Sequence, residues 1–374
     1  MSNRASLGHI YDQLKQDGYI DSDAMLQQQD DDKTNPWFIE GLMGCGGWIA
    51  AFFLLGTISI CITTVFTALD ETTIGFTLMV IGVILTVGTV AFNRFRKDSG
   101  VFVSQLSLMI HIAGQSAFFG GLFVAFALWR EDSTIVSALA ILITMQVIFI
   151  WLYPNVIYRF IAMLVIAGSV IAIDSTITVP ILNSIVVGIL FLLASLIWLD
   201  RLPVQWQFKQ MRLWHPVAYG SVIGALGILI YEISNRFYLD IPSSTAHITG
   251  GLLTAGLLLL IVTLLRDYEI VLTSPFAIAV LVFATIVSVI VISTPGIIAG
   301  IVVILLAFRR RNVILQGIGY GFLAGFIVYY YYWLDVSLLM KSIILVVTGV
   351  VLLVGRFGLN QLVTIPDAKK GISA

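Results

Sequence analysis

The sequence predicts an all-α, polytopic transmembrane helical bundle of about 12 spans. Of the 374 residues, 59% are hydrophobic and only 11% are charged. A soluble domain carries about 25% charged residues, because its surface must be wetted. The few charges of this chain also cluster, and the apolar runs between the clusters are long enough to span a bilayer. These observations exclude a soluble protein, and the net charge of −1 gives no indication of nucleic acid binding.

The N-terminal residues 1–35 differ from the rest of the chain. Leu7, Ile10, Tyr11 and Leu14 follow the i, i+3, i+4, i+7 spacing of a short amphipathic helix. A second short helix is expected after it, and “QQQDDDKTNP” is typical of a polar linker. We interpret this region as a cytosolic helical cap and linker, with a partner-docking hairpin as the alternative. About forty polar residues before the first apolar run also argue against a cleavable signal peptide.

The transmembrane helical domain is expected over residues 36–358, and a cytosolic tail over 359–374. Helix-length apolar runs predict each span in turn. The expected spans are 41–68, 73–92, 103–128, 133–152, 156–173, 178–198, 215–233, 247–265, 270–291, 294–308, 313–333 and 337–355.

The distribution of lysine and arginine predicts the orientation of the spans. Cytoplasmic connections of membrane proteins are enriched in these two residues. With the N-terminus in the cytosol, only three of the 20 lysines and arginines fall on the opposite side, namely Arg130, Arg236 and Lys341. Arg159, at the start of the fifth span, counts among the cytoplasmic residues. Both termini are therefore expected in the cytosol, which requires an even number of spans.

Residues 270–308 leave one ambiguity in this topology. Two apolar runs are separated there only by “STPG” (Ser293 to Gly296). The second run has about twelve residues before Arg309, which is short for a full span. A re-entrant hairpin and a pair of full spans both return Arg309 to the cytosol. We predict a tilted or kinked full hairpin, with the re-entrant hairpin as the alternative.

The third span, “VSQLSLMIHIAGQSAFFGG”, carries a polar face. Ser104, Ser107, His111 and Gln115 are three or four residues apart, so they share one side of a helix. Polar groups inside a membrane are costly and raise a question of function. One interpretation is a polar path for a proton or a small solute. The favoured one is interhelical hydrogen bonding that holds the bundle together.

Four charged residues form a candidate ion pair or cluster. Lys341 is expected about one turn into the final span, with Asp335 in the preceding connection. Asp174 and Glu232 are expected near the same side of the membrane, at the ends of the fifth and seventh spans. Lys341 either extends its stem to the interface or pairs with one of the three carboxylates. The sequence leaves both arrangements open.

Glycines and the absence of soluble catalytic motifs complete the pattern. Small residues permit close helix approach, so Gly41, Gly44 and Gly47 of the first span and Gly317 to Gly325 of the eleventh are interpreted as packing faces. No nucleotide-binding loop, zinc-protease motif or nucleophile elbow occurs, and the cysteines and histidines lack metal-site spacing. We expect no cofactor and no metal site.

Four segments resemble the bacterial membrane family catalogued as domain of unknown function 4401. These are “PWFIEGLMGCGGWIAAFFLLG”, “LSLMIHIAGQSAFF”, “HPVAYG” and “YYYYWLDVSLLMKSIILVVTGVVLL”. The resemblance covers about Pro36 to Arg356. It implies a multi-pass inner-membrane protein of Gram-negative-type bacteria that works with a neighbouring membrane protein of the GDYXXLXY type. It assigns no activity, and it draws attention to Gln115 and Lys341.

Three classes of function are compatible with these features. Sparse interior charge and the cytosolic cap favour a non-catalytic component of a membrane complex. The number of spans, the polar third span and the short segment after Pro295 favour a secondary transporter or permease. An intramembrane enzyme would need converging acid and base groups, and the sequence indicates none. The sequence therefore favours a non-enzymatic role.

Overall fold

The computed structural model describes residues 37–66, 70–95, 100–126, 132–177, 179–199, 204–238 and 243–333, with single positions between 339 and 357. These residues form eleven α-helices and no strand, which confirms the all-α prediction. The helices are α2 (Trp37–Phe66), α3 (Glu71–Phe95), α4 (Val101–Phe126), α5 (Asp132–Leu152), α6 (Val156–Ile177), α7 (Pro180–Trp198), α8 (Val204–Tyr238), α9 (Ser243–Asp267), α10 (Pro275–Ile290), α11 (Pro295–Arg310) and α12 (Val313–Trp333). The expected cap (1–35) and tail (359–374), together with Asp335 and Lys341, lie outside the described residues.

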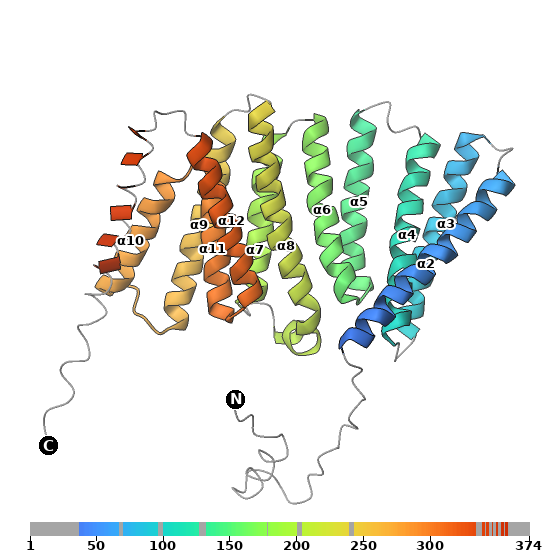
Figure 1. Cartoon of the computed structure of the whole chain (residues 1–374), viewed down its shortest axis with the longest axis horizontal. Coiled ribbons are helices and arrows are strands. Elements are labelled where there is room, and N and C mark those ends of the chain that lie inside the picture. Colours follow the sequence, from blue (N-terminus) through green and yellow to red (C-terminus); the bar gives the residue numbers. More distant parts are fainter. Residues whose placement is uncertain are drawn as a thin grey trace, which may run out of the picture.

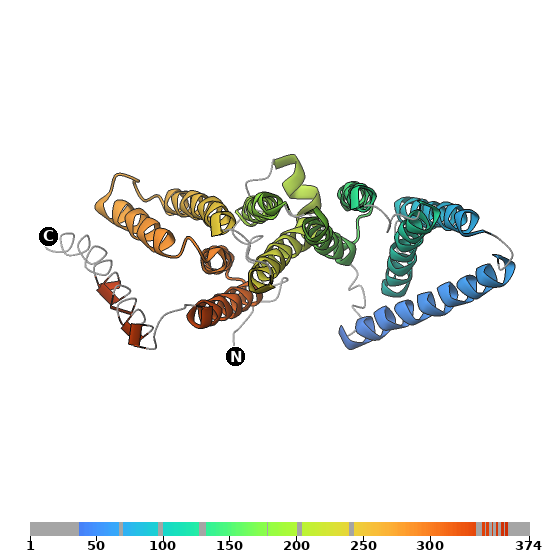
Figure 2. The same ribbon diagram turned by 90° about the horizontal axis from the view of Figure 1, so that it is seen from above.

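Successive helices run in opposite directions and form an elongated row (Figures 1 and 2). Among the described helices, α3 to α9 and α12 are the eight that are long and apolar enough to cross a membrane. Such helices indicate a membrane-embedded protein. The hydrophobic core lies where α6, α7, α8, α9 and α11 meet. At one end of the row, α2 packs against α4, and α4 packs closely against α3.

Local sequence signals explain several helix ends. Asp70 precedes α3, and its Oδ1 accepts a hydrogen bond of 2.6 Å from the Thr73 hydroxyl. This bond holds the pKa of the Asp70 carboxyl below its ordinary value. Asn155 precedes α6 and accepts from the Tyr158 N–H at 3.1 Å, and Ser274 caps α10 in the same way. Proline occupies the first turn of α7, α10 and α11, where its missing N–H costs nothing.

Close packing of α3 on α4 depends on glycines that face each other. A Cβ added at Gly121 would lie 2.5 Å from the Gly75 carbonyl oxygen, and one at Gly82 would lie 2.6 Å from the Gly114 carbonyl oxygen. The expected packing glycines are only partly in contact. Gly47 meets the backbone of α4, and Gly319 meets Ile304 of α11. Gly41, Gly317, Gly321 and Gly325 have no described neighbour within 4 Å of such a Cβ.

Most expected span limits lie within about a turn of the observed helix ends. The exception is α8, which begins at Val204 rather than at residue 215 and contains Pro216. The expected loop before it is thus largely helical. The expected span followed the apolar run alone, whereas the helix also includes the more polar stretch before that run and continues through Pro216.

The α10–α11 hairpin is shorter than its neighbours. At its open end, Arg309 forms an ion pair of 3.1 Å with Asp267, the last residue of α9. At the other end, the Ile292 carbonyl oxygen of the turn lies directly against Gly250 of α9. Gly250 is seven residues into α9, so the turn stops about 10 Å short of the start of α9.

The contact between α11 and α12 also shows that the α10–α11 turn stops short of the ends of the neighbouring helices. Gly296 packs against Phe326, seven residues before the end of α12 at Trp333. Each arm of the hairpin has 16 residues and is about 24 Å long, whereas the hydrocarbon core is about 30 Å thick. Its depth in the bundle favours the re-entrant alternative over the full hairpin predicted from the sequence.

Cysteine labelling tests the depth of this turn. In a variant without Cys45 and Cys61, a cysteine at Thr294 is expected to react with a membrane-impermeant maleimide far more slowly than a cysteine at Asp70. Both positions lie toward the same side of the bundle, but Asp70 precedes α3 and is exposed. Equal labelling rates at the two positions would show that the turn reaches the aqueous surface.

Candidate functional site: a neutral polar network between α3, α4 and the α5–α6 hairpin

The polar face expected on the third span lies on α4 and is enclosed by α3, α5 and α6. Ser107, His111 and Gln115 are buried. His111 is the eleventh residue of α4, which places it about 15 Å from the helix start, near mid-membrane depth. No acidic side chain of the described residues hydrogen-bonds to any of the four predicted residues. The site is therefore a neutral network of hydroxyls, amides and one imidazole.

Hydrogen-bond accounting assigns the tautomer of His111. The Thr89 hydroxyl donates to the Thr86 carbonyl oxygen at 2.8 Å, so its single proton is already used. Its oxygen lies 2.8 Å from Nδ1 of His111 and must accept from an Nδ1–H there. Nε2 is then the unprotonated nitrogen, and it accepts from Nε2 of Gln115 at 3.0 Å. His111 is neutral, with both ring nitrogens hydrogen-bonded.

A closed ring of three side chains extends from Gln115. Its Nε2 donates to the Tyr158 hydroxyl at 2.7 Å, and that hydroxyl donates to Oε1 of Gln146 at 2.8 Å. Nε2 of Gln146 donates back to Oε1 of Gln115 at 2.9 Å. The ring joins α4, α5 and α6. Each of the two amides thus has its oxygen and its nitrogen bonded, which is the condition for a buried network to stabilise a fold.

Aromatic rings enclose the imidazole on several sides. The Tyr153 ring stacks on His111 with a centroid distance of 4.2 Å and an interplanar angle of 5°. Phe149 and Tyr158 meet the imidazole edge to face, at 5.0 and 4.8 Å. His111 itself is 0% exposed. This enclosure leaves the imidazole no contact with solvent.

The two serines attach α4 to the turn between α5 and α6. The Ser107 hydroxyl lies 3.2 Å from the Tyr153 hydroxyl and accepts from Nδ2 of Asn93 at 2.7 Å. The Ser104 hydroxyl accepts from Nδ2 of Asn155 at 3.3 Å. Tyr153 and Asn155 belong to the short α5–α6 connection. The predicted face is thus bonded along its whole length to the α5–α6 hairpin.

This arrangement is suited to holding helices together. The backbones of α4 and α5 approach each other at few positions, so the side-chain network supplies most of the polar contact between α2–α4 and the rest of the bundle. Uptake of a second proton by His111 would require Nε2 to donate, and the Gln115 amide would have to turn over to accept. Such a turn would reverse every bond of the ring.

Comparison with known sequences places the chain in a family. The description “Domain of unknown function (DUF4401)” matches residues 36–362, most of the chain. The chain belongs to the DUF4401 family. This confirms the resemblance noted from the sequence. No curated protein and no solved structure matches this DUF4401 protein.

Only two of the four residues of the candidate ion pair in this DUF4401 protein, Asp174 and Glu232, are among the described residues, and both are acidic. Lys341 and Asp335 lie outside the described residues. Asp174 is buried near the end of α6 and accepts a hydrogen bond from Asn183 of α7 at 3.0 Å. Glu232 lies half-buried in α8. The pairing of Lys341 stays a prediction.

Several polar residues of the network were not singled out from the sequence. They are Thr89 and Asn93 of α3, Gln146 of α5, and Tyr153, Asn155 and Tyr158 around the α5–α6 turn. The available signal was an amide inside an apolar run, at Asn93 and Gln146. Tyrosines near helix ends resemble interfacial anchors and give no such signal.

Arg159 lies in an environment that the sequence did not predict. It was counted among the cytoplasmic residues and lies in the first turn of α6, but its side chain is 1% exposed inside the bundle. Its guanidinium lies 5.4 Å from the centroid of the Trp214 ring of α8, a cation–π distance. Trp151 meets the same indole edge to face at 5.0 Å. An arginine near a helix start was counted by its position in sequence, and the packing of α8 against α6 buries it.

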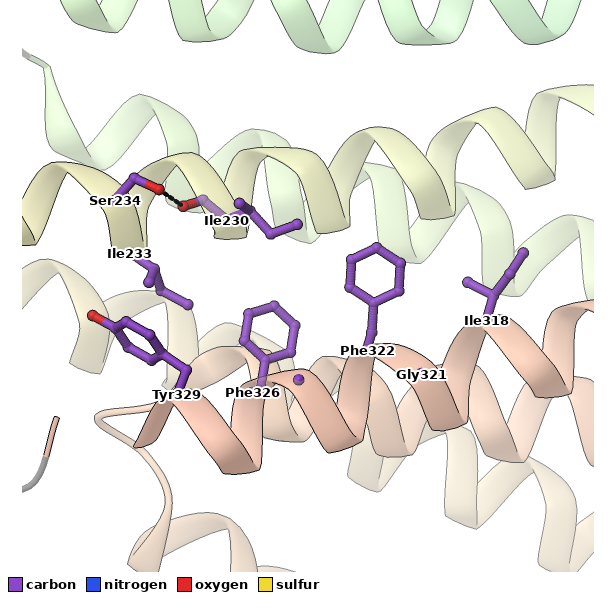
Figure 3. A pocket seen from close by; sticks show the side chains of 9 residues that line it. Ile230, Ile233, Ser234, Ile318, Gly321, Phe322, Phe326 and Tyr329 are labelled. Carbon is purple, nitrogen blue, oxygen red and sulfur yellow. Dashed lines mark hydrogen bonds between the residues drawn. The ribbon is translucent and has the colours of Figure 1, made fainter. Parts of the chain in front are cut away.

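Two cavities of the DUF4401 protein lie away from the network. One, of about 670 Å³, lies between α8 and α12, where Ile230 and Ile233 face Phe322, Phe326 and Tyr329 (Figure 3). The other, of about 840 Å³, runs between α7 and α9 and ends at Arg266 and Asp267. Neither is lined by a residue of the α4 polar face.

Proposed function

We propose that this DUF4401 protein is a non-catalytic component of a protein complex in the bacterial cytoplasmic membrane. The proposal includes cytosolic termini and 12 membrane segments, of which α10 and α11 form the re-entrant hairpin, so the number of complete spans stays even. The observation that supports it most is the closed ring of Gln115, Gln146 and Tyr158, in which the amide and hydroxyl groups bond to one another. A solute path would need polar groups that exchange partners. The ring is instead suited to a rigid scaffold.

The alternating helix directions support the proposed orientation. Arg94 at the end of α3, Arg266 at the end of α9 and Arg309 at the end of α11 lie toward the same side of the bundle (Figure 1). Basic residues on one side are typical of the cytoplasmic face. The N-terminus of α2 lies on that side as well.

Helix α2 is the element we propose for partner contact. It lies at the outer edge of the row and packs mainly against α4 (Figure 2). Leu42, Phe52 and Phe53 are 69%, 63% and 75% exposed, so most of its apolar surface contacts no other part of the described chain. Among the described residues, α2 packs mainly on one neighbour, so its other side can pack against a second membrane protein. The family resemblance suggests a partner of the GDYXXLXY type.

Photo-crosslinking in the native membrane tests this proposal. A photoreactive residue at Phe53 is expected to give an adduct of one discrete mass with another membrane protein. Ile189 of α7, which is 56% exposed, is the matched control and is expected to give lipid adducts only. If position 53 gives no protein adduct and gentle-detergent purification recovers the chain alone and stable, the proposal fails.

A secondary transporter is the second candidate. The α10–α11 turn inside the bundle and the buried carboxyl of Asp174 favour it, since broken or short segments and intramembrane carboxyls occur at transport sites. Uptake by purified protein in liposomes that is lost in His111→Ala would favour transport through the α4 site over the scaffold.

A further inference from the structure

Asp174 and Asn183 form a buried polar pair near the end of α6 and the start of α7. Their side chains are 7% and 1% exposed. Nδ2 of Asn183 donates to Oδ2 of Asp174 at 3.0 Å. The other two oxygens, Oδ1 of Asp174 and Oδ1 of Asn183, are buried and have no hydrogen-bond partner in the described part of the chain. Two acceptors are thus without a donor in one small site.

An ionised carboxylate is poorly accommodated here. Burial of a charge without a counter-charge is strongly unfavourable, and a single neutral N–H donor offsets only part of that cost. No described cationic side chain forms an ion pair with Asp174. An amide oxygen close to a carboxylate adds a second acceptor, which a negative charge repels.

We propose that Asp174 binds a proton and that, with Asn183, it forms a proton-binding site within the membrane. A proton on Oδ1 of Asp174 can donate to Oδ1 of Asn183. The neutral acid and the amide then face each other through two hydrogen bonds, N–H to Oδ2 and O–H to Oδ1. One proton removes the charge and gives both unpartnered oxygens a partner.

A metal cation fits the site less well than a proton. Hard cations such as Ca²⁺ or Mg²⁺ take about six oxygen ligands, and the site offers two. The hydroxyls next to the pair in sequence are bonded elsewhere. The Ser175 hydroxyl donates to the Ala172 carbonyl oxygen at 2.8 Å, and the Ser184 hydroxyl lies 2.7 Å from the Thr249 hydroxyl. No group of three or more His, Cys, Asp or Glu side chains with metal-site proximity occurs among the described residues.

The site couples protonation to helix packing. The two hydrogen bonds link the end of α6 to the start of α7. Release of the proton would restore the charge, remove the hydrogen bond from the carboxyl O–H and leave Oδ1 of Asp174 and Oδ1 of Asn183 without a donor. The contact between α6 and α7 is therefore expected to be tighter with the proton bound. This inference goes beyond the scaffold proposal and holds whether or not the protein transports a solute.

Infrared difference spectroscopy on the full chain in lipid at neutral pH tests the proposal. The wild-type spectrum minus that of Asp174→Asn is expected to show the C=O band of one neutral carboxyl group, shifted to lower frequency in D₂O. Asp267→Asn is the matched control, because Asp267 pairs with Arg309 at 3.1 Å and should lose carboxylate bands instead. Asn183→Leu should keep the neutral band and shift it to higher frequency.

Loss of carboxylate bands in Asp174→Asn would overturn the proposal, because Asp174 would then be ionised in the wild type. Spectra with and without Na⁺, and of Lys341→Ala, would then assign the partner of the charge as a metal cation, Lys341 or a bridging water. If Asp174→Asn does not accumulate, the band position in Asn183→Leu decides. An unchanged carboxyl region in that variant also overturns the proposal.

Discussion

Replacement of Gln115 by leucine is expected to lower the free energy of unfolding by about 3 kcal/mol. The change deprives His111 and Tyr158 of a donor and leaves an N–H of Gln146 without an acceptor. Each buried polar group left unpaired costs about 1–3 kcal/mol, and the smaller values apply within membranes. The loss should appear as a lower melting temperature in detergent and as earlier unfolding in a denaturant titration.

A neighbouring residue of the same helix provides the control. The Ser116 hydroxyl is exposed and bonds only to the Ile112 carbonyl oxygen of its own helix. Ser116→Ala is expected to change stability by less than about 0.5 kcal/mol. A Gln115→Leu protein as stable as the wild type would contradict the interpretation that the ring of Gln115, Gln146 and Tyr158 holds α4, α5 and α6 together.

The double variant tests whether the ring acts as a unit. In Gln115→Leu/Gln146→Leu the unpaired amide of Gln146 is removed together with its former partner. Residues of one network are not additive, and coupling energies of about 0.5–3 kcal/mol are usual. The double variant should be destabilised by much less than the sum of the single variants. Simple additivity would show that the two amides act independently.

The sequence was sufficient for the polar face of α4 but not for its partners. Ser104, Ser107, His111 and Gln115 share one side because helical spacing is a local property. Their partners come from α3, α5 and α6, and their register depends on where the α5–α6 turn stops. The spacing of residues within one helix does not show how deep the α5–α6 turn lies in the bundle. The same limitation explains why the burial of Arg159 was not predicted.

Depth also explains why the sequence left the α10–α11 hairpin ambiguous. Apolar composition predicted two helices around Pro295, and two helices occur there. How far they penetrate depends on contacts with Gly250 and Phe326 on other helices. Nothing in the sequence distinguishes Gly250 and Phe326 from the other glycines and aromatic residues of the chain. The short length of the second apolar run was the only local indication of a re-entrant hairpin. The count of lysines and arginines is the same for both arrangements, so it does not distinguish them.

Close approach of α3 and α4 went unrecognised for a similar reason. Gly75 and Gly82 on α3, and Gly114 and Gly121 on α4, are each seven residues apart, so each pair lies on one side of its helix. The pattern has meaning only once the two helices are known to be antiparallel neighbours. The sequence analysis instead interpreted the closely spaced glycines of α12 as a packing face. Most of these glycines have no described atom within 4 Å of an added Cβ.

Gly121→Leu is expected to have the largest effect of any single change in this part of the molecule. A Cβ at position 121 would lie 2.5 Å from the Gly75 carbonyl oxygen and 2.7 Å from the Met79 nitrogen. Backbone atoms cannot rotate away as a side chain does, so α3 and α4 must separate. Overpacking costs about 1–3 kcal/mol where side chains can adjust, and more is expected here.

Separation of α3 from α4 would also stretch the polar contacts between them. His111 depends on Thr89, and Ser107 depends on Asn93, both on α3. The variant should therefore lose monodisperse protein in size-exclusion chromatography and melt well below the wild type. Gly120, the adjacent residue, has no described atom within 4 Å of an added Cβ, so Gly120→Leu should behave like the wild type. Equal behaviour of the two variants would mean that α3 and α4 do not pack through their backbones.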